Sequence, residues 1–429
     1  MTEQKKNYTL PIVMMVILFG MISFVTNLAA PMGVVLKNQF GVSNALGMLG
    51  NLANFAAYAC MGIPAGLLLQ KVGYKRTALI AVAIGFVGLA VQYLSGHSAS
   101  FSIYLLGAFI AGFSMCMLNT VVNPMLNTLG GGGNKGNQLI QVGATFNSLA
   151  GTIVPMLVGA LIGDATKARI TDVFPVMYIA MGAFALIFVV LAIVQIPEPH
   201  ATTTKKASSN QKDKYSAWSF RHFVLGVIGI FVYVGVEVGI PGTMNLFLAD
   251  PDAGGLVATT AGFVVGTYWF LMLVGRFIGS GIASKVSSRL MLAVVSSAGL
   301  ILVIAAILSP VAVKVSIPVL QSDYSGISFG LTLVPVSAMF LVLAGLCTSI
   351  MWGGIFNLAV EGLGKYIAMA SGIFMMLVCG GGIMPFIQNA IADSAGYLTS
   401  YWVVFAGLVY LLYYALIGSK NVNKDIPVD

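Results

Sequence analysis

The sequence predicts an all-α membrane protein with twelve transmembrane helices in two six-helix bundles. The first observation is composition: of 429 residues, 58% are hydrophobic and only 8% are charged. A soluble domain needs more charge than this to cover its surface. The second is that the apolar residues form stretches of about 20 or more, long enough to cross a bilayer core as helices. The third is a single polar stretch that divides these segments into two sets.

Each apolar stretch is expected to form one membrane-spanning helix. The first is too long for a cleaved signal segment and is expected to remain as a span. The first six spans lie near residues 11–36, 44–70, 77–95, 101–129, 138–163 and 174–196. The second six lie near residues 221–249, 257–283, 289–309, 335–361, 365–393 and 398–418.

The polar stretch runs over residues 197–220 and is rich in Thr, Ser and Lys. That composition is typical of a flexible linker. We therefore expect an N-terminal bundle over residues 1–196 and a C-terminal bundle over residues 221–429. A second long connection, residues 310–334, joins the ninth span to the tenth on the external side.

The two halves carry matching landmarks. Asn27 precedes Pro31 by four residues in the first span, as Glu237 precedes Pro241 in the seventh. Paired halves with bent helices at corresponding places are typical of internal-repeat transporters, which bind their substrate near the middle of the membrane.

The basic residues are distributed unevenly among the loops. Of the 21 Lys and Arg residues, the loops on one side hold only Lys37, Lys167, Arg169 and Lys314. The tails and the alternate loops hold nearly all the others. Because an excess of Lys and Arg marks the cytoplasmic side, both termini are predicted to lie in the cytoplasm, with the chain in the inner membrane. The net charge of +8 therefore reflects topology, and no nucleic-acid partner is expected.

No residue pattern indicates covalent chemistry. The four cysteines all fall inside predicted spans, without paired spacing or a histidine companion, so neither a disulfide framework nor a metal site is expected. The turn at 131–136 matches G-x-G-x-x-G, but no strand precedes it, so a tight loop is expected rather than a nucleotide site. We therefore expect no cofactor and no enzymatic activity.

Glycines spaced by four, Gly62 with Gly66 and Gly275 with Gly279, predict close helix packing.

Glu237 is the one acidic residue predicted to lie in the middle of a span. Gly235, Gly239 and Pro241 surround it, which favours a thin or kinked helix. A polar group at this depth faces a cavity or a partner helix. Glu237 is therefore expected to bind substrate, to couple transport to a proton or an ion, or to pair with Arg276 of the eighth span.

Amide side chains are predicted at similar depth. They are Asn27, Asn119, Asn123, Gln141 and Asn357. Asn119 and Asn123 are four residues apart and share one helix face. An amide donates and accepts hydrogen bonds at once, which suits a polyhydroxylated ligand, although each amide can instead bond a neighbouring helix.

Three aromatic residues, Tyr268, Trp269 and Trp352, are also predicted near the middle of spans. Most tryptophans of membrane proteins lie at the interfaces, so central ones are informative. An indole face can pack on the apolar face of a sugar ring while its N–H reaches a hydroxyl. The alternative is ordinary packing between helices.

Segments in both halves resemble the fucose–galactose–glucose:H+ symporter branch of the major facilitator superfamily. The resembling segments are residues 123–124 with the glycine turn after them, 144–148, 233–237, 275–277, 355–364 and 380–385. The resemblance implies the major facilitator fold and alternating-access import of a monosaccharide such as glucose, galactose or fucose. It leaves open whether transport is coupled to H+, to Na+ or to neither.

The sequence departs from the fucose-symporter pattern at its acidic positions. The two carboxylates of that pattern fall on Ala30 and Asn119 here, whereas Asn27 and Trp352 match it. The two-carboxylate proton route is therefore closed, and Glu237 remains as the candidate coupling group.

Two other functions are compatible with the sequence. The first is a carrier or exporter of another small neutral solute, and the second is a non-transporting membrane sensor. A sensor normally adds a cytoplasmic signalling domain, and none is predicted. A monomer in the lipid bilayer is expected.

Overall fold

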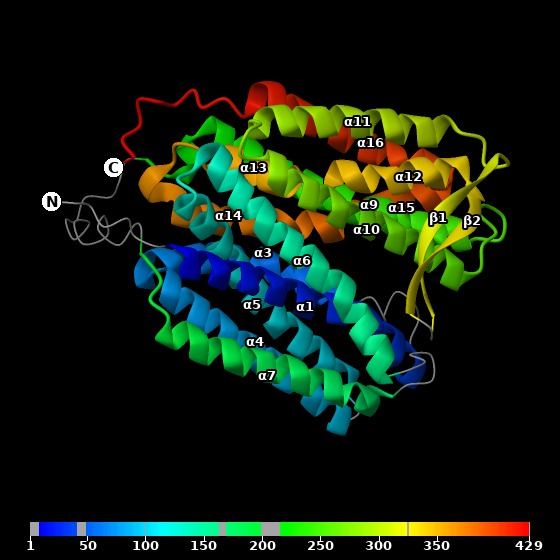
Figure 1. The fold of residues 1–429 in the computed structure, drawn as a ribbon, viewed down its shortest axis with the longest axis horizontal. Helices are drawn as coiled ribbons and strands as arrows, with labels where there is room; N and C mark the ends of the chain where they lie inside the picture. The colour runs from blue at the N-terminus through cyan, green and yellow to red at the C-terminus, as the bar shows by residue number, and fades with distance from the viewer. Residues whose placement is uncertain are drawn as a thin grey trace. The chain divides into compact units, whose positions relative to one another are not determined.

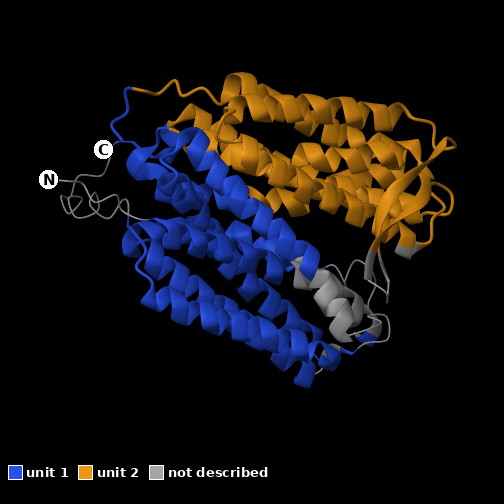
Figure 2. Ribbon diagram, viewed as in Figure 1, with its two compact units in different colours: residues 1–219, 362–376, 425–429 blue, residues 220–361, 377–424 orange. Residues whose placement is uncertain are grey.

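The structure is a computed structural model that describes residues 8–40, 49–98, 100–162, 169–198, 215–323 and 326–428. The chain forms two compact units (Figure 2). Unit 1 comprises Met1–Ser219, Gly362–Met376 and Asp425–Asp429, and unit 2 comprises Phe220–Glu361 and Leu377–Lys424. Division of the chain at a linker over 197–220 stays a prediction, and residues 199–214 of that stretch lie outside the described residues.

Helices make up most of both units (Figure 1). Those of unit 1 are α1 (Thr9–Phe40), α3 (Leu49–Val72), α4 (Tyr74–Ser98), α5 (Phe101–Leu129), α6 (Gly133–Ile162), α7 (Phe174–Ile193) and α14 (Ile367–Met376). Those of unit 2 are α9 (Arg221–Ala249), α10 (Ala258–Ile282), α11 (Ser288–Leu308), α12 (Val336–Thr348), α13 (Met351–Val360), α15 (Gly380–Ala395) and α16 (Tyr397–Tyr413).

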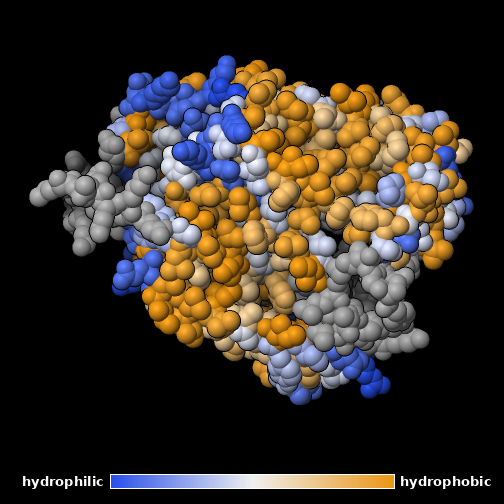
Figure 3. Space-filling model, in the orientation of Figure 1, coloured by the Kyte–Doolittle hydropathy of each residue, from blue (hydrophilic) through white to orange (hydrophobic). Residues whose placement is uncertain are grey.

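The predicted membrane fold of twelve helices is confirmed. Among the described residues, 11 helical segments are long and apolar enough to cross a membrane, and α6, with 30 residues, completes the twelve. Large apolar side chains such as Leu186 of α7 and Ile301 of α11 are exposed on the helix sides. Apolar residues cover much of the face in Figure 3, and hydrophilic residues gather toward the helix ends. A lipid environment accounts for this distribution. Exposing so many apolar side chains to water would be unfavourable, whereas the acyl chains of a bilayer are apolar themselves.

Polar side chains cap the N-termini of several helices by accepting hydrogen bonds from backbone N–H groups of the first turn. Ser100 and Ser287 cap α5 and α11, each hydroxyl accepting from the backbone N–H three residues later, at 3.4 and 3.3 Å. The Glu198 carboxylate does the same for α4, accepting from the backbone N–H of Tyr74 at 2.8 Å and of Lys75 at 2.9 Å. These contacts satisfy donors that the helix itself leaves free.

Two of the predicted spans are interrupted. The tenth consists of α12 and α13, separated at residues 349–350, which the sequence did not indicate. The eleventh consists of α14 and α15, with a 3-10 turn at Leu377–Cys379 between them. A Cβ atom on Gly380 would overlap the carbonyl oxygen of Phe231, so the start of α15 packs backbone to backbone on α9.

Close helix crossings occur at the glycines whose spacing predicted them. In unit 1, a Cβ on Gly62 would lie 2.5 Å from the Met376 nitrogen, and one on Gly66 would lie 3.1 Å from the Gly372 Cα. α3 and α14 therefore meet through their backbones. In unit 2, Gly275 and Gly279 of α10 instead make room for side chains of the α12–α13 interruption, because a Cβ on either glycine would overlap the side chain of Ser349 or of Ile350.

The connection between α11 and α12 folds into a hairpin, which the expectation of an all-helical chain missed. Strand β1 (Lys314–Asp323) pairs antiparallel with β2 (Gly326–Pro335), so that Lys314 lies opposite Pro335 and Asp323 opposite Gly326. In the middle of the hairpin, buried Ile317 and Val319 of β1 and Thr332 and Val334 of β2 alternate with exposed residues, as in a hairpin that packs one face on other elements.

Candidate functional site

Glu237 and Arg276 form a buried ion pair inside unit 2. Arg276 Nη2 lies 3.0 Å from Glu237 Oε1, and the side chains of Arg276 and Glu237 are 9% and 13% exposed, respectively. Arg276 Nε also donates to the Ser349 carbonyl oxygen at 3.2 Å. This carbonyl lies at the interruption between α12 and α13. Because a charge at membrane depth needs partners, Arg276 ties α9 and α10 to this interruption.

Tyr268 completes the hydrogen bonding of α9 beside the ion pair. Pro241 has no N–H, so the Glu237 carbonyl four residues earlier lacks its usual helical donor. The Tyr268 hydroxyl donates to that oxygen at 3.1 Å and lies 2.9 Å from Thr348 Oγ1. A Cβ on Gly345 would lie 2.5 Å from the Tyr268 carbonyl oxygen, so this glycine is what lets α10 and α12 approach so closely.

Aromatic rings continue this polar cluster on one side. Tyr233 is fully buried one helical turn before Glu237 and therefore lies on the same face of α9. Its ring meets the half-buried Trp352 edge-on, with centroids 6.3 Å apart. Trp269 instead stands edge-on to Tyr268 at 5.3 Å and is 39% exposed. Glu237, Tyr268 and Trp352 thus belong to one neighbourhood, and Trp269 lies at its margin.

Asn357 has a different partner. It is buried, and its Nδ2 donates to Ser288 Oγ at 2.8 Å. Ser288 is the first residue of α11. This hydrogen bond joins α13 to the N-terminus of α11, so it does not itself support the prediction that Asn357 contacts substrate.

A chain of neutral polar groups runs through unit 1. Asn119 Nδ2 donates to the Tyr58 hydroxyl at 2.9 Å and to the Met115 carbonyl at 3.2 Å. Asn123 Nδ2 donates to the Asn119 carbonyl at 2.9 Å and lies 3.3 Å from Asn119 Oδ1. The shared face that the four-residue spacing predicted is therefore confirmed. Since the Tyr58 hydroxyl accepts from Asn119, its own hydrogen can serve a further acceptor.

The remaining predicted residues of unit 1 lie on α1 and α6. Gln141 is fully buried on α6, and the Thr145 hydroxyl donates to its carbonyl oxygen at 2.8 Å. Asn27 belongs to α1, but its side chain lies outside the described residues. That these two amides bind substrate stays a prediction.

Sequence reasoning missed Tyr58, Thr348 and Ser349. A hydroxyl-bearing ring in the middle of the second span was a usable signal for Tyr58. Thr348 and Ser349 gave no signal, because their roles depend on the interruption of the tenth span, which follows no local pattern.

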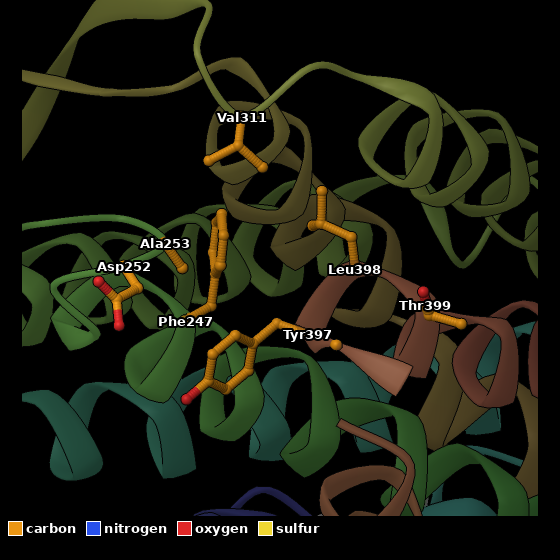
Figure 4. Close-up of a pocket in the computed structure, with 8 residues that line it drawn as sticks. Phe247, Asp252, Ala253, Val311, Tyr397, Leu398 and Thr399 are labelled. Atoms are coloured by element: carbon orange, nitrogen blue, oxygen red, sulfur yellow. The ribbon is translucent and has the colours of Figure 1, made fainter. Parts of the chain in front are cut away.

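A separate hollow lies where α9 ends and α16 begins (Figure 4). Its volume is about 310 Å³, and Phe247, Val311 and Leu398 make its walls largely apolar. The Tyr397 hydroxyl beside it is already paired with Asp250 Oδ2 at 2.9 Å. None of the predicted site residues lines this hollow, and we assign it no function.

Comparison with known proteins agrees with this architecture. The family model of the Major Facilitator Superfamily matches residues 12–385. The "Glucose/galactose transporter" of Brucella abortus biovar 1 (strain 9-941) is 32% identical over 427 residues, covering 98% of this chain and 97% of that protein. The "L-fucose-proton symporter" of Escherichia coli (strain K12) is 22% identical over 415 residues, covering 92% of this chain and 89% of that protein.

Solved structures agree on the fold. A crystal structure of the E. coli fucose:proton symporter FucP, determined on a point variant, superposes with a TM-score of 0.80 at 19% identity, covering 97% of this chain and 100% of that one. The family match, the identity to full-length relatives and the shared fold lead to one conclusion. The chain is a multi-pass membrane protein of the major facilitator superfamily, in its fucose–galactose–glucose branch.

Proposed function

We propose that this protein imports a monosaccharide, a hexose such as glucose, galactose or fucose, across the cytoplasmic membrane. The observation that carries the proposal is the 32% identity, over 98% of the chain, to a protein named glucose/galactose transporter. Transport proceeds by alternating access of a site in the middle of the membrane.

The chemistry of the two polar clusters supports a polyhydroxylated ligand. Tyr58, Asn119 and Asn123 offer amide and phenol groups in unit 1, and Trp352 offers an aromatic face beside Tyr233 in unit 2. Neutral donors and acceptors next to an indole ring suit a sugar, which presents hydroxyls at its rim and C–H groups on its faces.

In this proposal, Glu237 organises the sugar site rather than carrying the coupling ion. The 3.0 Å contact with Arg276 occupies one carboxylate oxygen, and the remaining lone pairs can accept sugar hydroxyls. Removing the carboxylate would also deprive the buried guanidinium of this counter-charge. Coupling to H+ or Na+ through Glu237 is the alternative, and the Glu237→Gln variant described in the Discussion separates the two.

The orientation follows from the charge distribution. With the Lys- and Arg-rich loops in the cytoplasm, both termini are cytoplasmic and the hairpin β1–β2 is external. The protein acts as a monomer, since each chain carries both clusters.

The test is uptake of labelled sugars by purified protein in proteoliposomes. Glucose, galactose, fucose and xylose are each measured with no gradient, with a proton gradient and with a sodium gradient. The proposal expects counterflow of at least one hexose. Counterflow of none of them would contradict it and would favour another neutral solute. Accumulation driven by one gradient would identify the coupling ion.

A further inference from the structure

The hairpin β1–β2 carries apolar side chains on both faces. Its register places Ile317, Val319, Thr332 and Val334 on one face, where they are buried within unit 2. A hairpin at a protein surface normally turns polar side chains outward on its other face.

The outward face of this hairpin is instead apolar along its middle. Phe329, Leu331 and Leu333 are 58%, 78% and 54% exposed, and Leu331 lies opposite Pro318. Exposed Lys314 lies at the base of this face, so the described apolar side chains run across the hairpin's middle.

Contacts with α10 hold the hairpin within the thickness of the membrane. The Leu320 N–H donates to Thr267 Oγ1 at 2.9 Å, and the same hydroxyl donates to the Phe263 carbonyl at 2.9 Å. Thr267 is nine residues from the start of α10, or about 14 Å along its axis. α10 has 25 residues and is about 38 Å long, close to the ~40–45 Å of a bilayer with its headgroups. Thr267 thus lies within Thr260–Ile282, the part of α10 that is long and apolar enough to cross a membrane.

The outward strip is continuous with a surface of α10 that faces lipid. The Phe329 ring packs edge-on against Phe270 with centroids 5.4 Å apart. Phe277 and Ile278, seven and eight residues after Phe270, lie on the same helix face and are 70% and 54% exposed. Figure 1 shows β1 and β2 crossing α10 and α12 rather than running along them, so the strands run across the direction in which these helices would span the membrane.

Edge hydrogen bonding is consistent with this boundary position. Because Leu320 directs its N–H away from β2, Pro318, two residues earlier, occupies an edge position where its missing N–H costs nothing. By the same alternation, Leu331 and Leu333, which lie opposite Pro318 and Ser316 in this two-stranded sheet, direct their N–H groups away from β1. Headgroups and interfacial water can pair with these groups, whereas acyl chains cannot.

We infer that the outward face of β1–β2 docks on lipid at the boundary between headgroups and acyl chains. The side chains of Phe329, Leu331 and Leu333 reach the outer acyl region, while Lys314 and the outer backbone edge of β2 meet headgroups and interfacial water. The hairpin is thereby a membrane-interface anchor of unit 2. This assignment is independent of which solute is carried.

The test measures the environment of single nitroxide labels in proteoliposomes. A variant without the four native cysteines receives Leu331→Cys, with Phe277→Cys as the lipid reference and Lys285→Cys as the water reference, since Lys285 is exposed in the turn after α10. Collision rates with oxygen, which enters acyl chains, and with Ni-EDDA, which stays in water, are compared by electron paramagnetic resonance.

The inference expects the oxygen to Ni-EDDA ratio at Leu331 to approach that at Phe277 and to exceed that at Lys285 several-fold. A ratio like that of Lys285 would mean an aqueous face and overturn the inference. Low collision rates with both reagents would mean a protein partner and would overturn it equally. Leu333→Cys repeats the measurement one residue pair nearer the base, so a single poorly folded variant does not decide the result.

Discussion

Neutralising one member of the Glu237–Arg276 pair is expected to cost more than neutralising both. At the observed 3.0 Å separation, attraction between unit charges is about 5 kcal/mol at an effective dielectric constant of ~20. Desolvation offsets part of this attraction, so the pair itself adds little net stability. Glu237→Gln nevertheless leaves the buried guanidinium without this counter-charge, and the expected loss in unfolding free energy is about 3–5 kcal/mol.

The measurement is a double-mutant cycle of Glu237→Gln, Arg276→Gln and their combination. Apparent melting temperatures in detergent report stability, and sugar counterflow reports the site. Because the double variant carries no charge at either position, it is expected to be more stable than either single variant. A double variant whose loss equals the sum of the two single losses would refute the reasoning. Glu237→Gln that keeps counterflow but loses gradient-driven accumulation would instead make Glu237 the coupling group.

Three further outcomes are expected. Trp352→Ala should weaken hexose binding by about 1 kcal/mol, an aromatic-contact magnitude, and an unchanged dissociation constant in a fluorescence titration would argue against sugar stacking. Tyr268→Phe should lower the free energy of unfolding by about 1–3 kcal/mol, because the Glu237 carbonyl loses the donor that replaces the missing proline N–H. The control for transport is Tyr410→Phe, which also removes a hydroxyl bonded to a backbone carbonyl, that of Leu225, but outside the site. Ser208→Cys should resist an impermeant maleimide applied to intact cells, and efficient labelling would reverse the predicted topology.

The membrane fold was predictable because its causes are local. Hydrophobic length along the chain determines the spans, and loop charge indicates their orientation. The interruption at Ser349 and the hairpin were not predictable in this way. Each depends on a tertiary partner, Arg276 for the Ser349 carbonyl and Thr267 for the Leu320 amide.

The sequence predicted the residue types of the candidate site better than the hydrogen-bond and ion-pair partners of those residues. The spacing of Asn119 and Asn123 predicted their shared face, and pairing of Glu237 with Arg276 was one of the alternatives that the sequence left open. A substrate role for Asn357 stays a prediction, because a buried amide in the middle of a predicted span has the same signal whether it meets a ligand or bonds a neighbouring helix, as its Nδ2 does to Ser288 Oγ.

The backbone contact between α3 and α14 in unit 1 has a consequence for conformational entropy. Gly62, Gly66 and Gly372 place no side chain in the crossing. Ordering a long side chain at a helix contact costs up to about 2 kcal/mol in lost rotamer freedom, whereas glycine has no rotamers to lose. Glycine at these three positions therefore lowers the side-chain entropy cost of forming this crossing. A methyl group at Gly62 would add no rotamer cost, but it would lie 2.5 Å from the Met376 nitrogen and abolish the close approach of the two helices.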